Sequence, residues 1–108
     1  MEKGRERTIS KECIARLASF FKAVGDENRV SIIYTLAKQE MCVNDIAAAV
    51  GISQSLVSHQ LRILKLEGFV KARREGKNSF YSLDDQHIVD ILDESLKHIT
   101  HKLEDERK

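Results

Sequence analysis

The chain has no proline, no internal repeat and no low-complexity tract, and it contains only two cysteines. No apolar run approaches the roughly 18 residues of a membrane-spanning helix, and no secretory signal pattern is present. We therefore expect a soluble, cytoplasmic protein without a membrane partner. The 108 residues fit a single domain over 1–108. Hydrophobic residues at 42% and charged residues at 32% exclude a disordered chain.

The chain also has little net charge, +1, which excludes a uniformly basic nucleic-acid binder. This average hides a division along the sequence. Residues 54–82 carry six basic and two acidic side chains, whereas residues 83–108 carry four basic and eight acidic ones. The first segment suits a polyanion and the second suits cations, although either could also be ordinary solvated charge.

Apolar spacing and helix-end signals predict four helices after a polar arm of about ten residues. The first helix ends at Gly25, Asp26 caps the second, and a third over 43–50 ends at Gly51. Ser53 caps the fourth helix, which Gly68 ends. The apolar residues expected to face inward are Ile14, Leu17, Ala18, Phe21 and Val24 in the first helix and Val30, Ile33, Tyr34 and Ala37 in the second.

The spacing then changes to that of strands. Residues 69–74 and 78–83 predict two strands joined through 75–77, which form a hairpin with a glycine in its turn. Helical spacing returns from Asp84 to the end of the chain. The predicted fold is mainly α with a β-hairpin wing, in the order α-α-α-α-β-β-α.

The third and fourth helices, with Gly51 between them, have the pattern of a helix-turn-helix. A helix that reads DNA must be polar where it is exposed and apolar behind. Its polar residues are Gln54, Ser55, Ser58, His59 and Arg62, while Leu56, Val57, Leu61 and Leu64 are available for the core. The hairpin adds Arg73, Arg74 and Lys77 at its tip, within reach of phosphates or the minor groove. A capped helix with a routine polar face is the alternative.

Three parts of the chain carry a family resemblance: “FFKAVGDENRVSII”, “EMCVNDIAAAVGISQSLVSHQLRILKLEGFVKARREGKNSFYSLDD” and the terminal helix. Over about residues 14–104 they resemble the ArsR/SmtB family of metal-sensing repressors. The resemblance implies a winged helix-turn-helix homodimer, joined through its terminal helices, that binds double-stranded operator DNA and leaves it when metal binds. It also implies that Gln54, Ser55, Ser58 and His59 lie on the DNA-reading helix and that Arg74 and Lys77 lie in the wing.

Four candidate metal ligands lie in the terminal segment, as Asp85-x-His87 and His98-x-x-His101. On one helix they share a stripe, but eleven residues of helix rise about 16 Å, whereas zinc–nitrogen bonds are about 2 Å long. The two halves of the motif can meet only if two copies lie antiparallel about a two-fold axis, which makes the site twice. Three imidazoles and one carboxylate in a tetrahedron suit zinc and admit cobalt. The positions match the C-terminal site of the zinc-responsive, CzrA- and SmtB-like branch of the family.

Other functions are less well supported by the residues. Cys13 and Cys42 could form a thiol, redox or other-metal sensor, and Cys42 with Asp45 resembles the family's second metal site. Asn44 replaces that site's second thiol, so inert buried thiols are the expectation. Four protein ligands leave no open position for a catalytic water, which argues against an enzyme. A winged-helix interaction module without DNA, and nickel as the metal, stay open.

Overall fold

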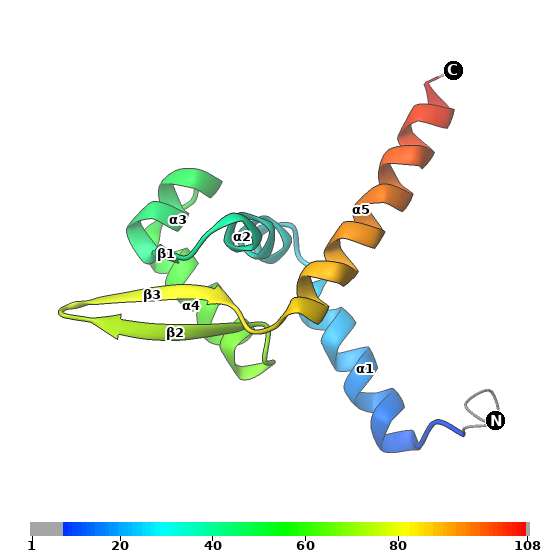
Figure 1. Cartoon of the computed structure of the whole chain (residues 1–108), viewed down its shortest axis with the longest axis horizontal. Coiled ribbons are helices and arrows are strands. Elements are labelled where there is room, and N and C mark those ends of the chain that lie inside the picture. Colours follow the sequence, from blue (N-terminus) through cyan, green and yellow to red (C-terminus); the bar gives the residue numbers. More distant parts are fainter. Residues whose placement is uncertain (1–7, 108) are drawn as a thin grey trace.

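The computed structural model describes residues 8–107, and its helices and strands form a small body from which two helices project (Figure 1). The elements in order are α1 (Lys11–Val24), α2 (Glu27–Lys38), β1 (Met41–Cys42), α3 (Val43–Val50), α4 (Gln54–Leu66), β2 (Val70–Glu75), β3 (Asn78–Leu83) and α5 (Gln86–Glu106). Helices α1 and α5 leave the body on the side opposite to the tip of the β2–β3 hairpin (Figure 1). Within the described residues, no helix is both long and apolar enough to span a lipid bilayer.

The helix ends follow the predicted capping residues. The side chains of Asp26 and Ser53 accept hydrogen bonds from the third residue of α2 and of α4, as expected of N-caps. Helix α3 has its predicted bounds, and Gly51 after it takes the left-handed conformation, with φ of 82°. A side chain at this position would strain the turn between α3 and α4, so glycine fixes the geometry of the helix-turn-helix.

Strand β2 begins and ends one residue later than predicted, so the turn of the hairpin is tighter. Strands β2 and β3 pair from Val70 with Leu83 to Glu75 with Asn78, so only Gly76 and Lys77 lie in the turn. Gly76, the first turn residue, has φ of 62°. The two-residue turns that usually join antiparallel strands require a positive φ at this position, which glycine adopts easily. The sequence also missed a third strand: β1 pairs antiparallel with β3, giving the order β1-β3-β2. Two residues are too few to show the alternation by which strands are predicted.

The core lies between α2, α3, α4 and the base of the hairpin. Its fully buried side chains are Ile32, Ile33, Ile46, Val57, Leu61, Leu64 and Phe69. The predicted inner face of α2 was partly wrong, because Val30 and Tyr34 are 39% and 36% exposed while Ile32 and Leu36 are buried. Helix α2 is apolar on two sides, and periodicity alone cannot tell which side its own chain covers.

Much of the apolar surface of α1 and α5 stays uncovered. Ile14, Leu17 and Phe21 on α1 are each more than half exposed, although the sequence placed them on a packed face. On α5 only Ile88 is buried, and Leu96, Ile99 and Leu103 lie open. Contiguous apolar surface of this kind marks an interaction site rather than an ordinary solvated helix.

Candidate functional site: DNA-reading surface and metal ligands

Helix α4 separates its polar and apolar residues as a DNA-reading helix requires. Gln54, Ser55, Ser58, His59 and Arg62 are all exposed. Val57, Leu61 and Leu64 are buried on the opposite side, and Leu56 is half-buried. Capping by Ser53 orders the first turn, where the polar residues begin. The arrangement leaves amide, hydroxyl and guanidinium groups free to approach base edges, but contact with DNA stays a prediction.

Gln60 departs from this division, because it is a polar side chain on the buried stripe of α4. It is 7% exposed, and its Oε1 accepts a hydrogen bond of 2.9 Å from Nη1 of Arg29 on α2. Neither Gln60 nor Arg29 was predicted from the sequence to have a role. A signal was present, since Gln60 is three residues after Val57 and four before Leu64, both of which were predicted to be buried.

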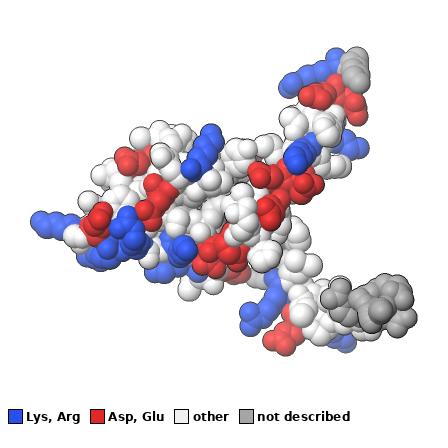
Figure 2. Space-filling model, in the orientation of Figure 1, with Lys and Arg blue, Asp and Glu red and all other residues white. Residues whose placement is uncertain are grey.

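The wing carries most of the basic side chains near α4, and Figure 2 shows Lys and Arg gathered around the β2–β3 hairpin. Lys71, Arg74 and Lys77 are exposed there. Nε of Arg74 donates to the Gly76 carbonyl at 3.3 Å, which holds its guanidinium at the turn. Arg74 and Lys77 therefore lie where a phosphate-contacting wing needs cations.

Arg73 does not lie free at the hairpin tip as the sequence suggested. Its guanidinium donates to both carboxylate oxygens of Glu40, at 2.8 and 3.3 Å, and lies 5.1 Å from the centre of the Phe80 ring. Glu75 is a second ion-pair partner at 3.5 Å. The hydrogen bond from Arg73 lowers the pKa of Glu40, and the same bond raises the pKa of Arg73. Arg73 therefore ties the wing to the segment before β1.

The four candidate metal ligands lie at two distant places on one chain. Asp85 precedes α5 and is its N-cap, accepting a 3.3 Å hydrogen bond from the Ile88 main-chain nitrogen. The prediction that it shares a helical stripe with the histidines was therefore wrong. Nδ1 of His87 is 3.6 Å from Oδ1 of Asp85, so these two side chains are neighbours.

His98 and His101 lie further along α5, and both are exposed. Helix α5 is continuous from Gln86 to Glu106, so His98 is about 16 Å along the axis from His87. Within residues 8–107, no three His, Cys, Asp or Glu side chains of one chain come together as a metal-binding group. The four candidate ligands of a single chain therefore form two separate pairs, Asp85 with His87 and His98 with His101.

The cysteines lie on other elements than these two pairs of candidate ligands. Cys13 is exposed on α1, so the expectation of a buried thiol was wrong there, and Cys42 is half-buried in β1. Both are free thiols. Asp45 is exposed in the first turn of α3. The role of Cys42 and Asp45 as a vestigial metal site stays a prediction.

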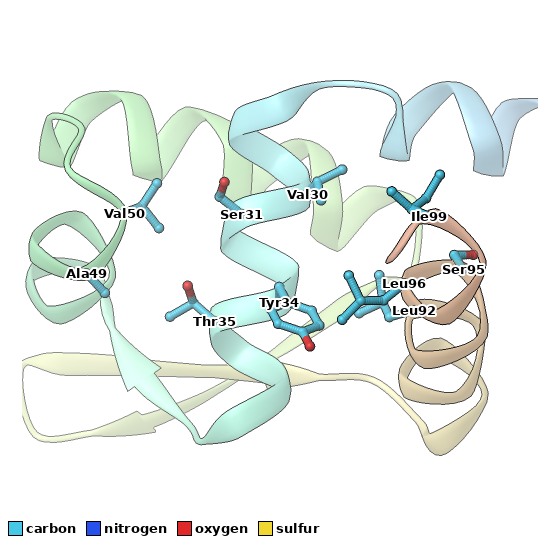
Figure 3. Close-up of a pocket in the computed structure, with 10 residues that line it drawn as sticks. All are labelled: Val30, Ser31, Tyr34, Thr35, Ala49, Val50, Leu92, Ser95, Leu96 and Ile99. Carbon is cyan, nitrogen blue, oxygen red and sulfur yellow. The ribbon is translucent and has the colours of Figure 1, made fainter. Parts of the chain in front are cut away.

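An apolar groove of about 580 Å³ lies between α2, α3 and α5. Figure 3 shows Val30 and Tyr34 of α2 facing Leu92, Leu96 and Ile99 of α5 across it. A second apolar cavity lies between α1, α2 and α5. These cavities join the uncovered faces of α1 and α5, so the apolar surface is continuous across this side of the molecule.

The helix pair α3–α4, followed by the β2–β3 wing, makes the chain a winged helix-turn-helix protein. A model described as “Bacterial regulatory protein, arsR family” matches residues 26–72. A transcriptional repressor SmtB homolog of Synechocystis is 46% identical over 84 residues, which is 78% of this chain and 64%, less than two thirds, of the relative. A cadmium resistance regulatory protein CadC homolog of Staphylococcus aureus is 38% identical over 86% of this chain and 78% of its own length.

A solved structure agrees with the sequence relatives. The homodimeric winged helix-turn-helix domain of Mb0332 from Mycobacterium bovis, described as a possible ArsR-family transcriptional regulator, has a TM-score of 0.76 and 26% identity. The match covers 99% of this chain and 94% of that one. The chain belongs to the arsR family of bacterial regulatory proteins, which are transcriptional regulators and not enzymes.

Proposed function

We propose that the protein is a homodimeric repressor that binds operator DNA and releases it when zinc, or alternatively cobalt, binds between its subunits. The observation that carries the proposed metal site is the separation of its four ligands into two pairs, along the stretch that begins at the N-cap of α5 and continues into the helix. Asp85 and His87 lie at one end of this stretch, and His98 and His101 lie about 16 Å further along. Only a second chain can bring three imidazoles and one carboxylate to one metal ion.

The uncovered apolar faces support the dimer. Ile14, Leu17 and Phe21 on α1 and Ile99 and Leu103 on α5 are too exposed for a monomer with nothing to cover them. The Mb0332 domain, similar in fold over nearly the whole chain, is described as homodimeric. Antiparallel pairing of α5 with its copy about a two-fold axis would cover apolar surface and form two identical metal sites.

The response to metal is supported by what the relatives are named for. One is a cadmium resistance regulator and another is a homolog of the repressor SmtB. The choice of zinc or cobalt rests on the donors, because nitrogen and oxygen ligands in a four-coordinate set suit these ions better than a soft ion that prefers thiolates. The metal, once bound, would join α5 of one subunit to the start of α5 in the other.

DNA recognition would come from α4 and the wing. Gln54, Ser55, Ser58, His59 and Arg62 would face base edges and nearby phosphates, and Arg74 and Lys77 would contact the backbone. Metal must bind the DNA-free arrangement of the dimer more tightly than the DNA-bound one, because a ligand shifts an equilibrium only by its differential affinity.

Mixed dimers test the shared site directly. His87→Ala and His101→Ala homodimers should each lack a tight zinc site. In their heterodimer one site has both defects, while the other combines the intact His87 of one chain with the intact His101 of its partner. Isothermal titration should therefore find one tight site in each heterodimer.

The matched control is a heterodimer of His98→Ala and His101→Ala. Both defects then lie in the same half of the motif, so each site lacks one ligand and no tight site returns. Recovery in the first mixture but not in the second identifies ligands shared between subunits. No recovery in the first mixture would refute the shared site and leave the DNA-binding assignment intact.

A further inference from the structure

The buried amide of Gln60 is held by a guanidinium that also contacts another helix. Nη1 of Arg29 donates to Oε1 of Gln60 at 2.9 Å, and Nε of Arg29 donates to the main-chain carbonyl of Ala23 at 2.5 Å. Ala23 lies in the last turn of α1 and is itself buried. The half-buried Arg29 on α2 therefore joins the end of α1 to the middle of α4.

The surroundings keep this side chain in place. Asp26 caps α2 by accepting a hydrogen bond from the main-chain nitrogen of Arg29 at 3.0 Å, which fixes the turn from which the side chain extends. The fork of donors on a guanidinium can serve two acceptors in fixed directions, which a single ammonium group cannot do. A rotation of α4 about its axis would move the Gln60 amide oxygen away from Arg29. Because a buried amide oxygen without a donor costs free energy, the contact with Arg29 restricts this rotation.

A second set of contacts joins α1 to the other end of α4. Ser19 Oγ on α1 donates to Glu67, the C-cap of α4, at 3.3 Å. The Phe20 ring stacks on Phe69, with ring centres 4.5 Å apart. Helix α1 is thus fixed to α4 at two places along α4, while its outer face, with Leu17 and Phe21, is uncovered.

We propose that Arg29 is a positioning residue for DNA recognition, which sets the orientation of α4 relative to α1. His59 and Ser58, which are exposed for reading, directly precede Gln60, so a turn of α4 at Gln60 moves them. In a dimer that packs through α1, the same contact sets the spacing and angle between the two reading helices. This inference rests on the proposed function, because it requires α4 to read operator DNA as part of a dimer.

The role differs from that of a residue that only stabilises the fold. Two reading helices must match half-sites about one helical turn of DNA apart, so a change in their orientation weakens operator binding selectively. Contacts to phosphates anywhere on DNA tolerate such a change, because they carry no sequence information. A merely structural residue would alter the melting temperature and the folded fraction, without changing the ratio of operator to random-DNA affinity among folded dimers.

The test uses Arg29→Met, Gln60→Leu and the double variant, with Arg16→Met as the matched control. Arg16 is on α1, and its exposed side chain has an ion pair only with Glu12 among the contacts within the described residues. Fluorescence anisotropy would measure affinity for operator DNA, for random DNA of equal length, and for an operator with one base pair added between its half-sites. Circular dichroism and sedimentation would establish at which temperature each variant is a folded dimer.

Arg29→Met and Gln60→Leu should each lower operator affinity about tenfold and leave random-DNA affinity and its salt dependence unchanged. Their preference for the natural half-site spacing should shrink as well. The double variant should lose no more than Arg29→Met alone, because Arg29→Met already removes the contact to Gln60 along with the one to Ala23. Arg29→Lys, which keeps the charge but not the fork, should recover operator affinity only in part.

Parent-like ratios of operator to random-DNA affinity in Arg29→Met and Gln60→Leu would overturn the inference. Additive losses in the double variant would do the same. If Arg29→Met does not fold, Gln60→Leu decides, since it replaces the buried amide by an apolar side chain of similar size. A parent protein without operator preference would instead refute the proposed function itself, so the two failures are distinguishable.

Discussion

Asp85 has two separable roles, a helix cap seen in the structure and a metal ligand in the proposed site. Its Oδ1 accepts the hydrogen bond from the Ile88 main-chain nitrogen, and its side chain is half exposed beside His87. Serine caps a helix about as well as aspartate, whereas alanine cannot cap. We therefore predict that Asp85→Ser and Asp85→Ala have equal effects on metal affinity and different effects on folding.

The size of the folding effect follows from the cap. Loss of an N-cap side chain costs about 1 kcal/mol, which lowers the melting temperature of a domain of this size by roughly 4–8 °C. Asp85→Ala should show this loss without metal, while Asp85→Ser should melt within about 2 °C of the parent. Both variants lack the carboxylate, so both should bind zinc at least about tenfold more weakly.

The assay needs one protein concentration throughout, because the melting temperature of a dimer depends on concentration. Circular dichroism of the metal-free protein gives the melting temperatures, and competition with a chelator gives the zinc affinities. Parent-like zinc affinity in Asp85→Ser would remove Asp85 from the ligand set. Parent-like melting of Asp85→Ala would show that the cap does not stabilise α5.

Three further predictions concern the DNA surface, the sulfur atoms and the wing. Arg74→Ala should weaken binding to all DNA and reduce the slope of log affinity against log salt concentration by about one unit. Gln54→Ala should instead lower the preference for operator over random DNA. If both variants bound DNA like the parent, the assignment of the DNA-reading surface would be wrong. The double change of Cys13 and Cys42 to serine should leave metal-driven release of operator DNA intact. The cobalt-loaded parent should also lack the intense near-ultraviolet absorption band of a cobalt–thiolate bond. If the parent had this band and the double variant lost it, the cysteines would be the metal ligands. The hydrogen bond and ion pair with Arg73 lower the pKa of Glu40, so this pair stabilises the wing above pH 4.5, and the stabilisation is lost as the pH falls below that value. The difference in melting temperature between the parent and Glu40→Gln should therefore vanish in acid. A difference that persisted in acid would contradict the ion pair as its source.

Features that depend on neighbouring residues were predictable from the sequence. The Ser53 cap, the bounds of α3 and the strand β3 each depend on a few adjacent positions. The spacing of the histidines along α5 is local in the same sense, since a continuous helix fixes it. The separation of polar and apolar residues on α4 followed from its periodicity, and the structure exposes the predicted reading residues accordingly.

Contacts between distant residues were not predictable. Arg73 and Glu40 are 33 positions apart, and Arg29 and Gln60 are 31 apart, so no local pattern links either pair. Arg73 was therefore assigned to the hairpin tip with its neighbours. Asp85 was placed on the helical stripe of the histidines, but it is the N-cap of α5, a position that favours aspartate whether or not it also binds metal.

The start of α5 lies where the wing and the proposed metal site meet. Strand β3 ends at Leu83, and the Asp84 main-chain nitrogen donates to the Phe69 carbonyl at 2.9 Å, immediately before Asp85. Phe69 is fully buried between the end of α4 and the start of β2. At the proposed site, a metal ion that drew Asp85 and His87 toward the other subunit would act on a segment bonded to the base of both α4 and the wing. In the proposed dimer, α5 of one subunit would supply His98 and His101, and the short junction at Asp84 in the other would transmit the change to α4 and the wing.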